Sequence, residues 1–182
     1  YQIGALAGFA AACGGRLAHV KPHGALYNMA AKDAALARAI ARAVKDFDAG
    51  LVLFGLSGSE LPRAGEQAGL RVAAEVFADR SYQADGSLTP RQHPDAMIRD
   101  ADAAIAQVLR MVGEGRVRSV QGTDVAVTAD TLCIHGDEAS AVDFARRIRH
   151  ALETEGFRVA PVGEAATMEP SPRRHEGREE NP

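Results

Sequence analysis

Short apolar runs alternate along the chain with longer segments in which apolar residues recur every three or four positions. Apolar runs of strand length occupy residues 17–20, 51–54, 71–77 and 131–134. The periodic segments predict helices over residues 3–13, about 30–47, 59–68, 96–112 and 138–155. Shorter strands are expected at residues 117–120, 125–127 and about 158–162. Apolar strands that alternate with helices are typical of a parallel sheet covered by helices.

The order of these elements predicts one α/β domain over residues 1–163. Residues 164–182 are rich in Pro, Arg and Glu with almost no apolar residue, so we expect a disordered tail. The chain opens on Tyr1, and its first residues already follow the helical pattern without a capping residue before them. Only about five parallel strands are visible, fewer than a closed barrel contains. We therefore expect a fragment whose true beginning is missing.

Composition narrows the class of protein. The chain has 182 residues, of which 46% are apolar and 25% charged, values that are ordinary for a globular domain. A formal net charge of −3 argues against a nucleic-acid-binding surface. No run approaches the roughly 18 apolar residues of a membrane span. The two cysteines, Cys13 and Cys133, are far apart, and we expect them to be buried, reduced thiols of a cytoplasmic protein.

The first strand stops at the segment Lys21-Pro22-His23-Gly24. Pro22 has no N–H group to donate, so it cannot continue a strand, and Gly24 allows a turn or a close approach to a ligand. Lys21 and His23 are thereby presented at the carboxyl end of a strand, where α/β proteins place their ligands. This position favours a functional role for both residues over a solvated strand end.

Polar residues also follow the other apolar strands. They are Ser57 and Ser59 after the second strand, Glu75, Asp79, Arg80 and Tyr82 within or behind the third, and His135 after the fourth. Because the carboxyl ends of parallel strands meet on one face, we expect Lys21, His23, Glu75, Arg80 and His135 to cluster there. Glu75 lies in an otherwise apolar strand and needs a partner, either Lys21 or Arg80. The Asp79–Tyr82 segment suits an anionic substrate.

Other polar residues keep two interpretations. Ser57, Gly58 and Ser59 precede a helix and either hold a phosphate or cap that helix, and they do not form a Walker A motif. Asn28 is either a ligand-binding residue or a turn residue. Residues expected to have structural roles are the helix N-caps Asp95 and Asp137 and the core histidine His19. The sequence contains no complete metal-binding motif.

Four segments resemble the signature blocks of one bacterial family. They are residues 21–28 (Lys-Pro-His-Gly-Ala-Leu-Tyr-Asn), 75–82, 86–91 and 132–137. In this order they resemble the LamB/YcsF family over most of the chain. The resemblance implies a (β/α) barrel of the glycoside hydrolase/deacetylase type. The barrel is expected to be N-terminally truncated and therefore incomplete, since the family's N-terminal third has no counterpart here.

The resemblance also implies an activity, the ATP-dependent cleavage of 5-oxo-L-proline to L-glutamate together with two other subunits, B and C. ATP, with Mg²⁺ as its counter-ion, is the expected cofactor; no tightly bound metal is expected, and the truncated chain alone is expected to be inactive. The residues implied are Lys21, His23, Glu75 and His135 for catalysis, Asn28, Asp79, Arg80 and Tyr82 for substrate binding, and, weakly, Ser57, Gly58 and Ser59 for phosphate binding. Two alternatives stay open, a metal-dependent amide or carbohydrate deacetylase and a non-catalytic scaffold subunit.

Overall fold

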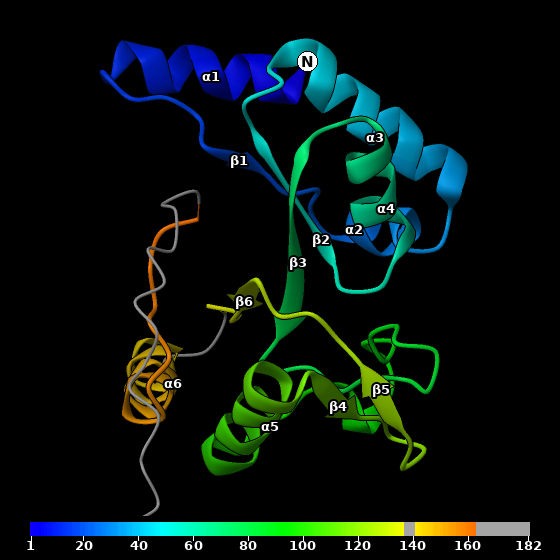
Figure 1. Cartoon of the computed structure of the whole chain (residues 1–182), viewed down its shortest axis with the longest axis vertical. Helices are drawn as coiled ribbons and strands as arrows, with labels where there is room; N and C mark the ends of the chain where they lie inside the picture. Colours follow the sequence, from blue (N-terminus) through cyan, green and yellow to red (C-terminus); the bar gives the residue numbers. More distant parts are fainter. Residues whose placement is uncertain (137–140, 163–182) are drawn as a thin grey trace, which may run out of the picture.

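Four parallel strands form the main sheet of the computed structural model, which describes residues 1–136 and 141–162. They are β1 (His19–Val20), β2 (Val52–Leu56), β3 (Arg71–Phe77) and β6 (Thr131–Cys133), in the order β1-β2-β3-β6. The sheet curls as half of a barrel (Figure 1), so the expected incomplete (β/α) barrel is confirmed. Residues 158–162 form no strand, and the prediction of one there is wrong.

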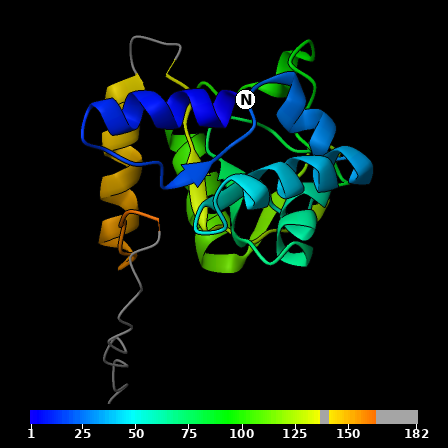
Figure 2. The same ribbon diagram turned by 90° about the horizontal axis from the view of Figure 1, so that it is seen from above.

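Helices surround this sheet, and a hairpin extends from it. The α-helices are α1 (Gln2–Ala12), α2 (Ala25–Ala30), α3 (Ala34–Phe47), α4 (Glu60–Gln67), α5 (Ala101–Glu114) and α6 (Ala141–Thr154). Between β3 and β6 the chain forms a 3-10 helix, η1 (Pro94–Ala96), and an antiparallel hairpin of β4 (Arg116–Arg118) and β5 (Asp124–Ala126). α3 and α4 pack together on one side, and α6 lies at the other side of the molecule (Figures 1 and 2).

Two predicted helices begin elsewhere because aspartates cap them. Asp33 Oδ1 accepts two backbone N–H groups of α3, at 2.8 and 3.0 Å, so the helix predicted over 30–47 is divided into α2 and α3. Asp100 Oδ1 accepts an N–H group of the first turn of α5 at 2.7 Å. The N-cap predicted at Asp95 is therefore wrong. The N-cap predicted at Asp137 and the tail predicted at 164–182 lie outside the described residues.

The two faces of the main sheet differ in chemistry. Val76 is fully buried on the face covered by helices. Its neighbours Glu75 and Phe77 point to the opposite face, because side chains alternate along a strand. The register of β3 and β6 places Phe77 opposite Cys133, so both side chains lie on this second face. The polar residues of the sheet are therefore separated from the apolar core by the backbone itself.

The packing of α4 on the sheet depends on two glycines. A Cβ atom on Gly55 of β2 would lie 2.7 Å from Cδ of Pro62, and one on Gly65 of α4 would lie 2.8 Å from Cγ2 of Val72. Real Cβ atoms essentially never come this close, so larger residues at either position would push the helix away. The loop between β2 and α4 is consequently held close to the carboxyl end of the sheet.

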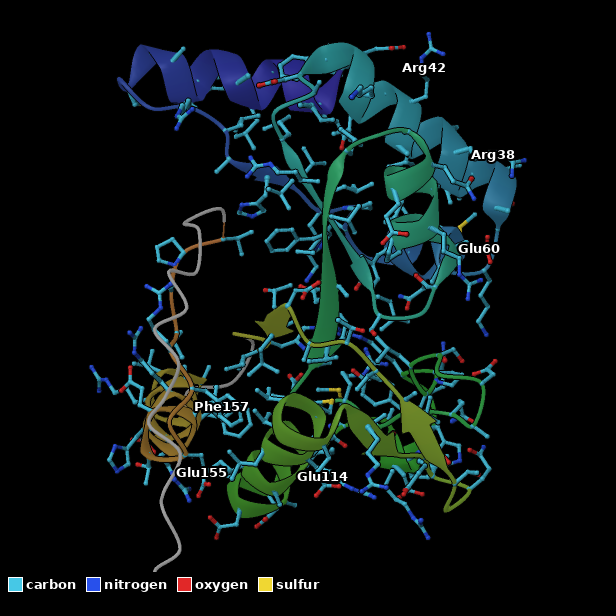
Figure 3. All side chains as sticks on the ribbon, in the orientation of Figure 1. Arg38, Arg42, Glu60, Glu114, Glu155 and Phe157 are labelled. Atoms are coloured by element: carbon cyan, nitrogen blue, oxygen red, sulfur yellow. The ribbon has the colours of Figure 1, made fainter. Side chains whose placement is uncertain are left out.

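Two residues that we expected in the core are exposed. Cys13 follows α1, a helix with no buried residue. His19 is exposed, and its ring stacks on Phe54 with the ring centroids 4.4 Å apart. The apolar neighbours of His19 suggested burial, but β1 is an outer strand of the four-stranded sheet and pairs only with β2 among the described strands. The outer face of α3 is polar, and its side chains Arg38 and Arg42 point into solvent (Figure 3).

We predict that Tyr82→Phe destabilises the protein. Tyr82 is fully buried, and its hydroxyl oxygen accepts a hydrogen bond from the Phe77 N–H at 2.8 Å. The substitution leaves that buried N–H without an acceptor, which lowers the free energy of unfolding by about 1–3 kcal/mol. Chemical denaturation of the full-length protein measures the change. Tyr1→Phe is the control, because the Tyr1 side chain is fully exposed. Equal losses in the two variants would contradict the prediction.

Candidate active site

An ion pair joins the carboxyl end of β1 to the interior of β3. Lys21 follows β1 directly, and buried Pro22 then ends the strand. Lys21 Nζ donates a hydrogen bond to Glu75 Oε1 at 2.8 Å. The Glu75 side chain is only 3% exposed and that of Lys21 32% exposed. The partner that Glu75 was expected to need is therefore Lys21, and the pair spans the intervening strand β2.

Aromatic and thiol groups surround the Lys21 ammonium. Lys21 Nζ lies 3.3 Å from Cys133 Sγ, 5.4 Å from the centre of the Tyr27 ring and 5.2 Å from that of Phe77. Both rings stabilise a cation through their π faces. Burial lowers the pKa of Lys21, but the hydrogen bond and charge of Glu75 outweigh that effect and leave the pKa above its ordinary value. Lys21 is thus a cation at neutral pH.

The groups beside this cation are neutral or incompletely paired. Burial raises the pKa of the Cys133 thiol, and Lys21 offsets only part of that rise, so the thiol is protonated at neutral pH. Burial and the charge of Glu75 raise the pKa of Tyr27. The Tyr27 hydroxyl and Glu75 Oε2 are both buried without a hydrogen-bond partner among the described residues. The site therefore keeps hydrogen-bonding capacity next to a fixed charge.

A second pair lies where β3 and β6 end. His135 Nδ1 is 2.7 Å from Asp79 Oδ2, and the His135 backbone N–H donates to the same oxygen at 3.2 Å. A carboxylate that accepts the Nδ1 hydrogen leaves Nε2 to accept or donate a proton. The ring of Phe77 is 5.9 Å from the ring of His135 and also contacts the Lys21 ammonium. Phe77 thus connects the two charged pairs.

The His135–Asp79 pair borders a cleft of about 450 Å³. Three arginines and a group of apolar side chains line it. The lining residues are Asp79, Arg91, Met97, Ile98, Arg99, Ala101, His135, Ala141, Asp143, Phe144 and Arg147. Asp79 Oδ1 is buried here without a hydrogen-bond partner among the described residues. A concave space with apolar walls, cations and a histidine at its edge is suited to a small anionic ligand.

Gln107 holds the chain that carries Asp79, and sequence reasoning missed it. Its Nε2 donates to the carbonyl oxygens of Phe77 and Arg80, at 3.1 and 3.0 Å. Polar residues are common in amphipathic helices, so nothing in the pattern of α5 singled out Gln107. Cys133 and Tyr27 were also missed as site members. Their signal was present, because each lies within a segment that resembles a family signature.

Arg80 and Tyr82 do not join the two pairs. The Arg80 guanidinium donates to the carbonyl oxygens of Thr89 and Ala96, at 2.6 and 3.2 Å, and is buried. Burial and nearby Arg91 lower the pKa of Arg80, which Asp79 partly offsets. Arg80 therefore fastens the loop after β3, and the expected cluster of Arg80 with Lys21 and His135 is wrong. Tyr82 points into the core, where burial raises its pKa.

His23 and Asn28 are exposed residues near Lys21. The His23 side chain makes no hydrogen bond or ion pair within the described part of the chain. Asn28 Nδ2 donates to the Gly24 carbonyl oxygen at 3.2 Å, which is the local turn role that the sequence left open. Their catalytic and substrate-binding roles stay predictions.

The loop of Ser57, Gly58 and Ser59 offers little to a phosphate. The backbone N–H groups of Ser57, Ser59 and Glu60 already donate to carbonyl oxygens. Ser57 Oγ accepts the Thr128 N–H at 2.8 Å, and Glu60 places a carboxylate in the first turn of α4. Ser59 is the N-cap of α4, although its hydroxyl does not bond the helix. The helix-start interpretation thus fits this loop better than the phosphate-binding one.

The described residues contain neither a cluster of metal ligands nor a membrane-spanning helix. Over residues 1–136 and 141–162, no group of three or more His, Cys, Asp or Glu is placed to hold a metal ion. In the same ranges, none of the helices has both the length and the apolar character that crossing a membrane requires.

The chain belongs to the LamB/YcsF family, whose sequence profile matches residues 1–167. The A subunit of the 5-oxoprolinase from Geobacillus kaustophilus is 67% identical over 159 residues, which cover 87% of this chain and 62% of that protein. The corresponding A subunit from Bacillus subtilis is 59% identical over 164 residues, or 90% of this chain and 64% of that one.

A solved structure agrees with the fold. The crystal structure of the lactam utilization protein from Thermus thermophilus is 50% identical, with a TM-score of 0.78, over 87% of this chain and 63% of that one. This chain therefore spans less than two thirds of the length of these relatives.

We predict that Lys21→Met destabilises the full-length protein. The change leaves the Glu75 carboxylate buried without its cation. Because Lys21 is partly exposed, we expect the free energy of unfolding to fall by about 2–3 kcal/mol, at or below the lower end of the range for buried ion pairs. Adding Glu75→Gln should restore part of the loss, since it removes the unpaired charge. Lys32→Met is the control, because Lys32 lies 3.8 Å from Asp85 with both side chains largely exposed. Denaturant unfolding of the wild type and these three variants measures the changes, and a double variant no more stable than Lys21→Met would contradict the prediction.

Proposed function

We propose that this protein is a subunit of an ATP-dependent 5-oxoprolinase, which cleaves 5-oxo-L-proline to L-glutamate with hydrolysis of ATP to ADP and phosphate. The observation that carries the proposal is the position of two charged pairs, Lys21–Glu75 and His135–Asp79, at neighbouring parallel strands, with the second pair at the border of a cleft. The family and the names of its relatives support the same reaction. Two further subunits, B and C, and Mg²⁺ as the counter-ion of ATP, are part of the proposal.

The chemistry requires activation of a stable amide. A lactam carbonyl is a poor electrophile, and transfer of the γ-phosphoryl group of ATP to its oxygen makes the ring carbon susceptible to water. Water then adds to that carbon, and the C–N bond breaks with the nitrogen taking up a proton, which leaves an acyl phosphate. A second water hydrolyses the acyl phosphate to phosphate and the new carboxylate of glutamate. This sequence needs a fixed cation near the oxygen and a group that moves protons.

The described residues supply both functions. Lys21 presents an ammonium that is held by Glu75 and by two aromatic faces, so it is preorganised to stabilise negative charge on oxygen. His135 is oriented through Nδ1 by Asp79, and its Nε2 is the atom proposed to take a proton from water or give one to the departing nitrogen. The Phe77 ring contacts both groups.

The two alternatives predict different behaviour. A scaffold subunit would bind its partner subunits but neither nucleotide nor 5-oxoproline. A metal-dependent deacetylase would need a set of metal ligands, and the described part of the chain offers no such set of three or more. The pairing of Asp79 with His135 favours proton transfer over the scaffold alternative, because a scaffold has no need of an oriented imidazole.

We predict that His135→Gln lowers turnover by about 10²–10⁴-fold, the usual contribution of a general acid or base. The assay is ATP-dependent release of glutamate from 5-oxoproline by the full-length protein with its two partner subunits. His150→Gln is the matched control, because His150 lies exposed on α6, away from the two pairs. Omission of ATP, or of either partner subunit, should abolish release by the wild-type complex.

Three outcomes would count against the proposal. Wild-type turnover by the His135→Gln variant would remove His135 from the reaction. Glutamate release without ATP would contradict the activation step. Absence of release by the complete wild-type complex, with intact assembly of the subunits, would favour the scaffold alternative.

A further inference from the structure

The cleft beside His135 contains one arginine whose charge is not neutralised by a described residue. Arg147 is paired with Asp102 at 2.6 Å, and Arg99 also has an interaction partner. Arg91 lines the same cleft and forms no ion pair or hydrogen bond with any residue that the structure describes. A cation that is left unpaired at the edge of a cleft is available to an anionic ligand.

Arg91 also lies close to the loop that follows the carboxyl end of β3. The charge of Arg91 lowers the pKa of Arg80, the residue after Asp79, because the two guanidinium groups repel each other. Asp79 itself is 7% exposed and lines the cleft, and its Oδ1 lacks a donor among the described residues. The cleft therefore combines an unpaired cation with an unpaired, buried acceptor.

The walls between these polar groups are apolar. Met97 and Ile98 come from the segment between η1 and α5, and Phe144 comes from α6. All three side chains are partly buried, and the space of about 450 Å³ is ample for a five-membered ring. A saturated ring packs against such a surface without needing further polar contacts.

We propose that Arg91 is the residue that selects a cyclic amide bearing a carboxylate. This inference rests on the proposed function and names the part of the site that recognises its substrate. Arg91 holds the carboxylate as a charge-assisted pair, and Asp79 Oδ1 accepts the N–H of the ring amide. In 5-oxoproline the carboxylate and the N–H are borne by neighbouring ring atoms, so one ligand satisfies both unpaired groups. The alternative ligand of Arg91 is a phosphate group of ATP, the second substrate, and the experiment distinguishes it from the carboxylate of 5-oxoproline.

The first arm of the experiment measures steady-state kinetics of the full-length protein with its partner subunits. We expect Arg91→Met to raise KM for 5-oxoproline by about tenfold or more, the loss typical of a hydrogen bond to a charged group. KM for ATP should stay within twofold. Arg91→Lys should recover part of the affinity, because it restores the charge without the planar fork. Arg38→Met is the matched control, since Arg38 is an exposed arginine on the outer side of α3 (Figure 3).

The second arm measures binding without turnover. Calorimetric titration of the full-length protein with 5-oxoproline and with 2-pyrrolidinone, the same ring without a carboxylate, separates ring recognition from carboxylate recognition. The wild type should prefer 5-oxoproline, and Arg91→Met should remove most of that preference. If 5-oxoproline binds in an Arg91-dependent manner but the complete complex shows no turnover, the proposed activity is contradicted and this inference is supported.

Three results would overturn the inference. One is an Arg91→Met variant with wild-type affinity and KM for 5-oxoproline. The second is an Arg91→Met variant whose KM rises for ATP and not for 5-oxoproline, which would assign Arg91 to the phosphate of the nucleotide. The third is failure of the wild-type protein to bind 5-oxoproline in the calorimeter.

Discussion

The contact between the Lys21 ammonium and the Glu75 carboxylate determines how the rest of the site is arranged. A carboxylate buried to this degree in a sheet is stable only with a cation beside it, and the only strand end that supplies one nearby in the described chain is that of β1. The pair crosses over β2 and thereby fixes the distance between β1 and β3. Phe77 and Tyr27 then complete the surroundings of the cation. The positions of Cys133 and His135 follow from the register of β6 on β3.

The separation of the two sheet faces explains why so many reactive groups coexist with a stable core. Val76 and its apolar neighbours pack under the helices, whereas Glu75 and Phe77 face the other way. Substitution of Lys21 or Glu75 therefore changes mainly charge and hydrogen bonding, whereas truncation of Phe77, itself a buried core residue, would open a cavity. The Gln107 amide adds a second support, because it holds the carbonyl groups of the chain that turns away after β3.

The sequence was sufficient for the sheet, its parallel strands and part of the site. Lys21, Glu75 and His135 came together because residues at the ends of neighbouring parallel strands must share one face. Arg80 lies beyond the end of β3, and its guanidinium is taken up by the carbonyl oxygens of Thr89 and Ala96 in the loop that it fastens. The cap Asp33 was missed because the helical pattern of apolar residues was traced through it from about residue 30. The cap Asp100 was missed because Asp95 precedes the same helix, and only the backbone geometry decides which of the two caps it. Gln107 and the cleft depend on contacts between distant segments, which no local pattern encodes.

The strand order has a consequence for any chain segment that pairs with this sheet. Within the described residues, β1 and β6 each have a single neighbouring strand, so each leaves one row of backbone N–H and C=O groups open. These two outer strands are also the ones that end in Lys21 and His135. A parallel strand added at either edge would bring its own carboxyl end directly beside one of the charged pairs. Completion of the sheet and completion of the reactive centre are therefore a single event in this architecture.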